Sequence, residues 1–309
     1  MRSVIELTNT TTGTSNVAGI TPEIWSATVE QQAQALRVAR NFCRIDRSLV
    51  GRPGDVVHIL KGAKLTTAAD VETSHTEGNE ATYYALDDYG TLDLTPAPFL
   101  SSVRITDDVI EEVQADVLAD ANYLIAEALA QYEDTLILST VADTSSINEV
   151  WGGDATSEAD LDTGDIMTTD LFANALRELR IDSYGMATSN LVCFIHPYME
   201  NAFLKDSQFV NAAEFGSDTV IQKGVIGKYL GVTIVSTPNV TANSPNSGSG
   251  YTCLMWEVGK GPVVAVKHDV RVETDRNVQY QCYDVVGRIK FAVGVLFVNA
   301  VCKLECTIS

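Results

Sequence analysis

The feature that most restricts the fold of this chain is a run of 35 residues, 107–141, that contains neither glycine nor proline. Its apolar residues recur at spacings of three and four, as on one face of an α-helix. They are Ile110, Val113, Val117, Ala121, Leu124, Ala128 and Tyr132. Thr106 or Asp107 can cap the first turn, and the acidic residues that follow complement the helix dipole. We therefore predict one helix of about 50 Å, since each residue adds about 1.5 Å. It is far longer than an average helix.

Residues 51–105, which precede this helix, predict a long two-stranded excursion. Residues 51–71 open on turn residues and continue as a strand, and residues 90–106 are also extended in character. The polar, acidic segment 72–89 between them has too few apolar residues to form a core. An isolated hairpin is at best marginally stable in water. The excursion must therefore lie on something, and the chain offers no obvious partner domain for it.

The N-terminal residues predict an arm followed by a helix. The first 20 residues are rich in Thr, Ser and Asn and have little to bury. Such an arm would be ordered only if something outside its own domain held it. A helix is expected over residues 22–42, because Thr21 suits the cap and Pro22 suits the first helical position.

Residues 165–260 predict alternating helices and strands. Helices are expected at 168–181 and 197–206, the second opened by Pro197. Strands are expected at 190–196, 232–237 and 250–259. Residues 151–165 predict an acidic loop, and residues 241–250 a flexible, exposed one. From 261 to 308 the alternation of β-branched residues predicts a closing run of strands, so the fold class is α+β.

The composition argues against nucleic-acid binding through basic patches and against a membrane span. Asp and Glu number 41 against 21 Lys and Arg, which gives a net charge of −20 and repels phosphate backbones. Hydrophobic residues make up 45% of the chain, as in folded globular proteins. The polar N-terminus has no secretory signal pattern, and the longest apolar run, 291–302, is too short to cross a bilayer. We expect a soluble protein with no membrane partner.

The six cysteines are interpreted as free thiols packed as small hydrophobic residues in a reducing compartment. They are Cys43, Cys193, Cys253, Cys282, Cys302 and Cys306. A zinc site usually needs two close pairs of ligands. The nearest candidates are Cys193 with His196 and Cys302 with Cys306, and neither has the usual spacing. No metal site is expected.

Three glycines, Gly224, Gly227 and Gly231, raise the question of a phosphate-binding loop. A dinucleotide fingerprint needs G-x-G-x-x-G after a strand and before a helix. Here the spacing is G-x-x-G-x-x-x-G, and the strand follows the glycines. A Walker A loop does not match either. The glycines are therefore interpreted as a tight turn into a strand.

No other motif predicts catalysis. The chain lacks G-x-S-x-G, H-E-x-x-H and S-x-x-K, and its four histidines stand apart from any convincing nucleophile. They are His58, His75, His196 and His268, of which His196 is interpreted as a strand-end residue with a satisfied contact. Three carboxylate pairs are interpreted as a solvated loop and a helix start: Asp87–Asp88, Asp107–Asp108 and Glu111–Glu112. We expect no enzyme, no cofactor, and no catalytic, cofactor-binding or metal-binding residue.

Taken in order, these elements resemble the major capsid (coat) proteins of tailed phages and related viruses, which have the Hong Kong-97 fold. The most specific stretch is 193–240: a strand, His-Pro, a helix ending in Lys-Asp, the spaced glycines, and an apolar strand ending at a Pro-Asn turn. Residues 275–304 are similar to the family's closing strands. The resemblance covers essentially the whole chain, and its specificity comes from the order of the patterns.

The resemblance implies a Hong Kong-97-like capsid fold with five parts. These are an N-terminal arm and first helix (1–50), an extended loop (51–105), a spine helix with the first part of a peripheral domain (106–164), an axial domain (165–260) and the closing peripheral strands (261–309). In the family the extended loop and the arm reach neighbouring subunits. Residues 241–250 would lie near the centre of each ring.

The implied function is an icosahedral shell that encloses a viral double-stranded DNA genome without sequence-specific binding. Many copies of the chain would assemble as pentamers and hexamers, with a scaffolding protein, a portal and cement proteins as further partners. The implied location is the virion, with assembly in the host cytoplasm.

Two departures and several alternatives accompany the resemblance. The type member begins with a scaffolding segment that a protease removes, whereas this chain opens at Met1 with the arm, so a separate scaffold or none is expected. The type member also cross-links a loop lysine to an asparagine of another subunit. Lys61 and Lys64 lie in the loop here and Asn277 among the later strands, but they are interpreted as ordinary solvated residues.

The main alternative is an encapsulin-type nanocompartment that encloses enzyme cargo. The Thr-rich arm favours a virus, since encapsulins usually open with a helix. An α/β enzyme with an undetected site, and a tail or head-completion protein, are further alternatives.

Overall fold

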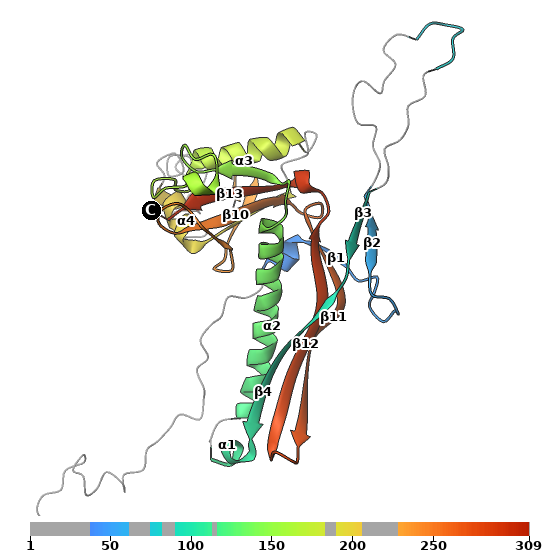
Figure 1. Cartoon of the computed structure of the whole chain (residues 1–309), viewed down its shortest axis with the longest axis vertical. Coiled ribbons are helices and arrows are strands. Elements are labelled where there is room, and N and C mark those ends of the chain that lie inside the picture. Colours follow the sequence, from blue (N-terminus) through green and yellow to red (C-terminus); the bar gives the residue numbers. More distant parts are fainter. Residues whose placement is uncertain are drawn as a thin grey trace, which may run out of the picture.

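The computed structural model of this chain describes residues 38–61, 75–81, 90–112, 116–182, 190–205 and 228–308. Two β-sheets and one long helix dominate it (Figure 1). A four-stranded sheet runs alongside helix α2 (Val117–Ala142), and a seven-stranded sheet lies across the upper end of that helix. A two-stranded sheet projects at the side. The structure confirms the α+β class.

The expected single helix over 107–141 is wrong, because a new helix begins at Val117. Helix α1 (Asp107–Glu112) is short and lies at the lower end of α2 (Figure 1). Asp116 has φ −76° and ψ 80°, which is not helical, and its side chain accepts a hydrogen bond from the Ala119 N–H at 3.1 Å. Aspartate is a strong N-cap, so it can start a helix inside a run that lacks glycine and proline.

The expected apolar stripe is right for Ile110, Val117 and Ala121, which pack in or against the core, and wrong further along the helix. Ala121 is buried as expected, but Leu124 is 40% exposed and Tyr132 is 44% exposed. The residues that face the core are instead Ala121, Ile125, Leu129, Ile137, Leu138 and Val141. Both series have helical spacing, so periodicity alone does not decide which of them packs on the sheet.

The four-stranded sheet packs one face on α2. Its order is β1 (Arg44–Asp46), β11 (Pro262–Asn277), β12 (Cys282–Val295) and β4 (Ala97–Thr106), with β1 parallel to β11 and the other pairs antiparallel. Alternate residues of β12, such as Val285 and Ile289, are buried. Gly287 lies so close to the helix that a Cβ atom there would be 2.3 Å from Ile125 Cγ2. Glycine at this position permits the close approach of helix and sheet.

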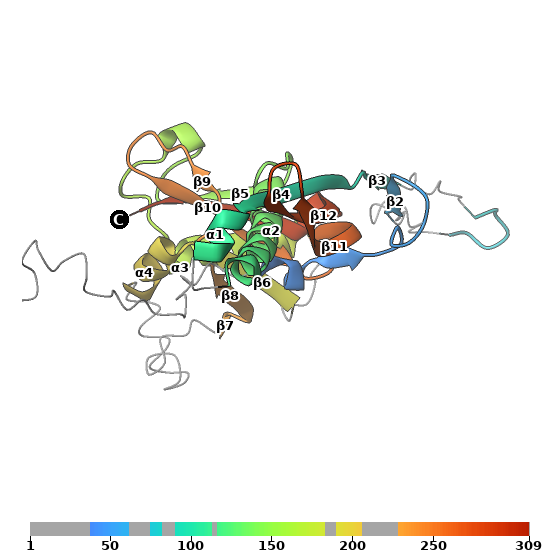
Figure 2. The same ribbon diagram turned by 90° about the horizontal axis from the view of Figure 1, so that it is seen from below.

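The opposite face of the same sheet supports the root of the extended hairpin. Strands β2 (Val57–Leu60) and β3 (Thr91–Leu94) pair in antiparallel, and they lie on the other side of the sheet from α2 (Figure 2). Their buried residues Val57, Ile59 and Leu94 form one apolar cluster with Val263 and Ala265 of β11. The expectation that the hairpin has no partner in its own chain is therefore wrong at its root. The residues between the strands lie mostly outside the described part.

The second sheet is built from strands that are distant in the sequence. Its order is β5 (Asn148–Trp151), β13 (Val301–Thr307), β10 (Gly250–Glu257), β6 (Leu191–Ile195), β8 (Val232–Ser236) and β7 (Lys228–Tyr229), and β9 (Ala242–Asn243) also pairs with β10. Helices α3 (Thr169–Asp182) and α4 (Pro197–Lys205) pack on one face. Both helices and the buried strands β6 and β10 confirm the predicted alternation.

The last strand, β13, does not lie in the same sheet as β11 and β12. Strands β11 and β12 pair with each other, but β13 pairs with β10 along seven residues and thus belongs to the upper sheet. The closing segment predicted at 261–309 is therefore divided between the two sheets. Two short 3₁₀ turns, η3 (Glu158–Asp160) and η5 (Val298–Ala300), lie in the connections.

The predicted helix over 22–42 falls almost wholly outside the described residues. Its last four residues form a 3₁₀ turn, η1 (Ala39–Phe42), rather than α-helix. This turn lies where the two sheets meet: Phe42 packs edge-on against Phe194 of β6, and its carbonyl accepts a hydrogen bond from Trp256 Nε1 at 3.1 Å. The predicted arm, the first 20 residues, also lies outside the described part.

Candidate assembly surfaces

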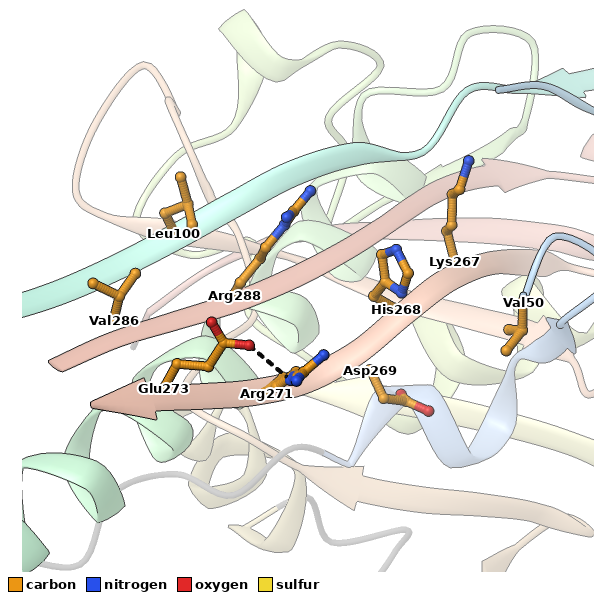
Figure 3. A pocket seen from close by; sticks show the side chains of 9 residues that line it. All are labelled: Val50, Leu100, Lys267, His268, Asp269, Arg271, Glu273, Val286 and Arg288. Carbon is orange, nitrogen blue, oxygen red and sulfur yellow. Dashed lines mark ion pairs between the residues drawn. The ribbon is translucent and has the colours of Figure 1, made fainter. Parts of the chain in front are cut away.

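An open groove lies on the face of the four-stranded sheet that points away from α2 (Figure 3). Its volume is about 540 Å³. It is lined by Val50, Leu100, Lys267, His268, Asp269, Arg271, Glu273, Val286 and Arg288. Alternation along β11 and β12 turns Arg271, Glu273, Val286 and Arg288 toward this side. The register is irregular between Val266 and Arg271, and there the consecutive residues 267–269 all line the groove. The hairpin root covers the upper part of the same face and leaves this lower part open.

The groove is basic, although the chain as a whole is strongly acidic. Its acidic residues are already neutralised: Asp269 pairs with Arg40 at 2.7 Å, and Glu273 pairs with Arg271 at 2.9 Å. Lys267 donates to the Gly54 carbonyl. Arg288 forms no ion pair with any residue that the structure describes. Between these charges, Leu100 is 65% exposed and Val286 is 37% exposed.

A second exposed feature is the turn between β11 and β12, at the lower end of the sheet. Val278 is 71% exposed and Tyr280 is 64% exposed. The Arg104 guanidinium stacks over the Tyr280 ring at 5.0 Å and binds Asp284 through two hydrogen bonds. Cation–π stacking and bidentate pairing both restrict Arg104 and hold Tyr280 against it.

The amide of Asn277 is engaged within this turn. It donates to Asp284 Oδ2 at 3.4 Å and accepts from the Gln279 N–H at 3.2 Å. Lys64, one of the two loop lysines, lies outside the described residues. A cross-link through Asn277 is untested.

A buried polar network fixes the point where the N-terminal segment enters the fold. Asp134 Oδ1 of α2 accepts hydrogen bonds from the Val38 and Ala39 N–H groups at 3.0 and 2.6 Å. Burial raises the pKa of this carboxyl group, and the same hydrogen bonds oppose the rise. Next to it, Arg40 bridges Glu133 of α2 and Asp269 of β11. Arg40 therefore connects the turn η1, helix α2 and strand β11.

The structure confirms that His196 is a strand-end residue with satisfied contacts. It is 8% exposed, its ring stacks on Tyr251 at 3.7 Å, and its Nδ1 accepts from the Tyr198 N–H at 3.3 Å. Burial lowers its pKa. Of the other histidines, His58 pairs with Asp93 on the exposed hairpin and His268 lines the groove.

The six cysteines are all buried thiols that form no disulfide among the described residues, as predicted. Cys193, Cys253, Cys302 and Cys306 belong to the apolar cluster between the upper sheet and helices α3 and α4. Burial raises the pKa of Cys193 well above its usual value, which keeps the thiol protonated and unreactive.

The remaining candidates have structural roles where they are described. Leu230 and Gly231 have φ of 48° and 86° at the turn between β7 and β8, which supports the turn interpretation for Gly231. Gly224, Gly227 and the pair Asp87–Asp88 lie outside the described residues. Asp107 begins α1 and pairs with Arg276 at 2.7 Å.

Among the described residues, no group of three or more His, Cys, Asp and Glu side chains is placed to hold a metal ion. Over the same residues, no helix has the length and hydropathy needed to cross a membrane.

Comparisons with known proteins agree with this geometry. A family model described as phage capsid protein matches residues 101–303, about two thirds of the chain. The chain belongs to the phage capsid protein family. It is a structural protein of the virion shell, and the match includes α2, the groove-lining strands β11 and β12, and most of both large sheets.

Solved phage structures share the fold at low sequence identity. A chain from Mycobacterium phage Che8 is 21% identical with a TM-score of 0.71, covering 92% of this chain and 96% of that one. The capsid of cyanophage P-SCSP1u is 16% identical with a TM-score of 0.75, covering 98% and 97%. The head of Helicobacter pylori bacteriophage KHP40 is 10% identical with a TM-score of 0.74, covering 98% and 100%. Among curated proteins, no sequence matches this chain significantly.

These findings confirm the Hong Kong-97-like fold and the major capsid function, and they do not favour the encapsulin alternative. The groove and the Arg40 network were missed from the sequence. Charges at every second position of β11, from Lys267 to Asp275, were a usable signal for the groove. The network had no local signal, because Arg40 and Asp269 are 229 residues apart.

Proposed function

We propose that this capsid protein assembles, as pentamers and hexamers, into an icosahedral shell around a double-stranded DNA genome and has no enzymatic activity. The observation that supports this best is the open groove on the long sheet, beside the root of the hairpin formed by β2 and β3. A single subunit thus exposes a surface that could receive a segment of a neighbour. Symmetric assembly of many copies would bury this surface.

The occupant of the groove in this proposal is the hairpin of a neighbouring subunit. Strand β2 runs away from the four-stranded sheet and β3 runs back toward it (Figure 1). Residues 71–88, between those strands, include five acidic residues and no lysine or arginine. Opposite charges guide docking and fix register. An acidic segment would therefore suit Arg271 and Arg288.

The experiment is assembly of the expressed chain, followed by sizing and negative-stain electron microscopy. Wild type should form closed shells or rings of five or six subunits. Arg288→Glu should keep the fold, as circular dichroism reports, but lose or greatly slow assembly. Arg177→Glu, at an exposed arginine on α3, should assemble normally.

Different results would contradict the two parts of the proposal, docking in the groove and self-assembly into a shell. Shells from Arg288→Glu at the wild-type rate would reject the groove as the docking surface but leave the shell intact. A wild-type chain that stays monomeric or dimeric at high concentration, even with crowding or a candidate scaffold, would reject self-assembly.

Further parts of the proposal rest on the family resemblance. They are a separate scaffold, a portal and cement proteins as partners, assembly in the host cytoplasm, the five-part division of the chain, and residues 241–250 near the centre of each ring. The 241–250 segment is anchored, since Ser247 Oγ and Asn246 Nδ2 both donate to Asp162.

A further inference from the structure

The open face of the four-stranded sheet, on the side away from α2, carries its charges in separate rows. The strand register places Arg271 of β11 directly opposite Arg288 of β12, and Lys290 adds a positive charge in the row above. Four residues further along β11, Asp275 lies directly opposite Asp284. Residues directly opposite each other on paired strands share one face of the sheet. This face is therefore basic in its upper part and acidic in its lower part.

Like charges that lie directly opposite each other on neighbouring strands are unfavourable. In each of the two pairs, one member has an ionic partner inside the subunit. Glu273 binds Arg271 at 2.9 Å, and Arg104 binds Asp284 at 2.6 Å.

The other member of each pair has no such partner. Arg288 and Asp275 form no ion pair with any residue in the part of the chain that the structure describes. They lie about 13 Å apart along the strands. The open face thus presents one positive and one negative charge that no ion pair within the subunit neutralises.

A two-fold axis brings these opposite charges together between two copies of the chain. Glu273 and Val286 lie directly opposite each other, halfway between the basic and the acidic row. If the axis crosses the strands at this level, the two faces meet with their strands antiparallel, and each basic row lies over the acidic row of the other copy. Arg271 then comes over Asp275 of the second copy. Glu273 meets its own copy at the axis but keeps its pair with Arg271.

The shape of the face is compatible with such a contact. Sheets that pack face to face lie about 10 Å apart with their strands nearly aligned. Val286, which is 37% exposed, would supply an apolar contact at the centre. The hairpin root lies at the upper end, where Val57 and Leu94 pack on Val263. The two-fold axis places the two roots at opposite ends of the dimer, where they leave its centre open.

The size of the face predicts a weak dimer. The open part is three strands wide and about five residue pairs long, roughly 14 Å by 27 Å or about 400 Å² per copy. Stable complexes usually bury about twice this area per partner. The contact would therefore be reversible and sensitive to salt.

We propose that two free subunits dimerise through this face, with the basic row of each copy on the acidic row of the other and Val286 at the two-fold axis. The dimer covers the groove in both copies. Because the groove is also the proposed docking surface for the hairpin of a neighbour, a dimeric subunit does not accept a hairpin until the dimer dissociates. Only this last consequence rests on the proposed function.

The test is sedimentation velocity of the full-length, unassembled chain from low to high micromolar concentration. Wild type should form a dimer that dissociates on dilution, with a dissociation constant at least about tenfold higher at high salt than at low salt. Arg271→Asp and Asp275→Arg should each abolish the dimer, because either variant alone brings like charges together. An equimolar mixture of the two should dimerise again, since both contacts of the mixed dimer then join an acidic and a basic side chain.

The matched control is Arg177→Asp, which makes the same charge change at an exposed arginine on α3. It should dimerise like the wild type. Arg271 and Asp275 are also exposed, so circular dichroism should show the wild-type fold for all three variants.

Four outcomes would overturn the inference. The first is a wild type without dimer-sized species at low salt, whether it stays monomeric or passes directly to rings and shells. The second is a dimer of Arg271→Asp or Asp275→Arg as stable as that of the wild type. The third is a mixture of these variants that stays monomeric, which would exclude the two-fold arrangement. The fourth is an equal loss of the dimer in Arg177→Asp.

The proposed function is tested separately from the dimer. A wild type that forms dimers but never shells would reject self-assembly into a shell and leave the dimer in place.

Discussion

The Arg40 guanidinium and the Glu133 carboxylate form an ion pair, Nη1 to Oε1, of 3.0 Å, with side chains only 7% and 0% exposed. Burial of two charges is unfavourable unless each compensates the other. Asp269 supplies a further partner for Arg40 from the sheet. The pair therefore holds the N-terminal segment on α2 at the point where the two sheets meet.

Removal of one partner should destabilise the subunit strongly. Arg40→Ala leaves the Glu133 charge buried without its arginine, and the loss should be about 3–5 kcal/mol. Urea unfolding of the unassembled subunit measures it. Arg271→Ala breaks the exposed Arg271–Glu273 pair, with side chains 79% and 67% exposed, and should change the free energy of unfolding by less than about 1 kcal/mol. Equal effects of the two variants would contradict the importance of burial here.

Addition of one methyl group between α2 and the sheet should also destabilise the subunit. A Cβ at position 287 would lie 2.3 Å from Ile125 Cγ2 and 2.8 Å from Leu129 Cδ1. Gly287→Ala should therefore cost about 1–3 kcal/mol through overpacking. Thermal and urea unfolding report the change. Gly164→Ala is the control, because nothing lies within 4 Å of the added atom. If Gly287→Ala left the free energy of unfolding unchanged, α2 would have to be able to move away from the sheet at no cost.

His196 should make the subunit less stable in mild acid. Burial lowers its pKa from 6.5, so the folded state holds the proton less tightly than the unfolded state. Its contribution is fully present above about pH 6.5 and is lost as the pH falls through the folded-state pKa. Protonation at Nδ1 would also oppose the hydrogen bond from the Tyr198 N–H.

The measurement is the urea midpoint of wild type and His196→Asn between pH 7.5 and 5. Asparagine can accept the same hydrogen bond but does not titrate. The wild type should lose more stability over this range than the variant. Parallel pH profiles would contradict the assignment.

Glu305 should have the opposite pH dependence. Burial raises its pKa, while hydrogen bonds from Asn243 Nδ2 at 2.8 Å and Thr252 Oγ1 at 2.9 Å partly oppose this. Because the folded-state pKa is raised, the contribution of Glu305 is fully present below about pH 4.5 and is lost as the pH rises through the folded-state pKa. Glu305→Gln keeps an acceptor for both donors and removes the buried charge.

The expected result is a variant that is more stable than wild type at pH 7, by on the order of 1 kcal/mol, with the difference shrinking toward pH 4. Chemical unfolding at the two pH values measures it. The same substitution at exposed Glu273 is the control and should have little effect at either pH. A Glu305→Gln subunit that is less stable at pH 7 would show that the carboxylate charge is favourable in place.

Local elements were predictable because their signals lie in neighbouring residues. Pro197 at the first position of α4 and the buried run of β6 identified those elements directly. The burial of the cysteines followed from their apolar surroundings. The order of such elements was enough to identify the family. It did not identify the groove, because Leu100 and Arg288 become neighbours only through pairing of β4 with β12.

By itself the sequence determined the type and order of most elements, the absence of recognisable catalytic motifs, and the family. Only the tertiary structure decided that a new helix starts after Asp116, that Ile125 rather than Leu124 faces the sheet, and that β13 joins β10. The physical reason is common to the last two. Helical and strand periodicity are local properties, whereas the face that is buried and the strand that is paired depend on surfaces contributed by residues far along the chain.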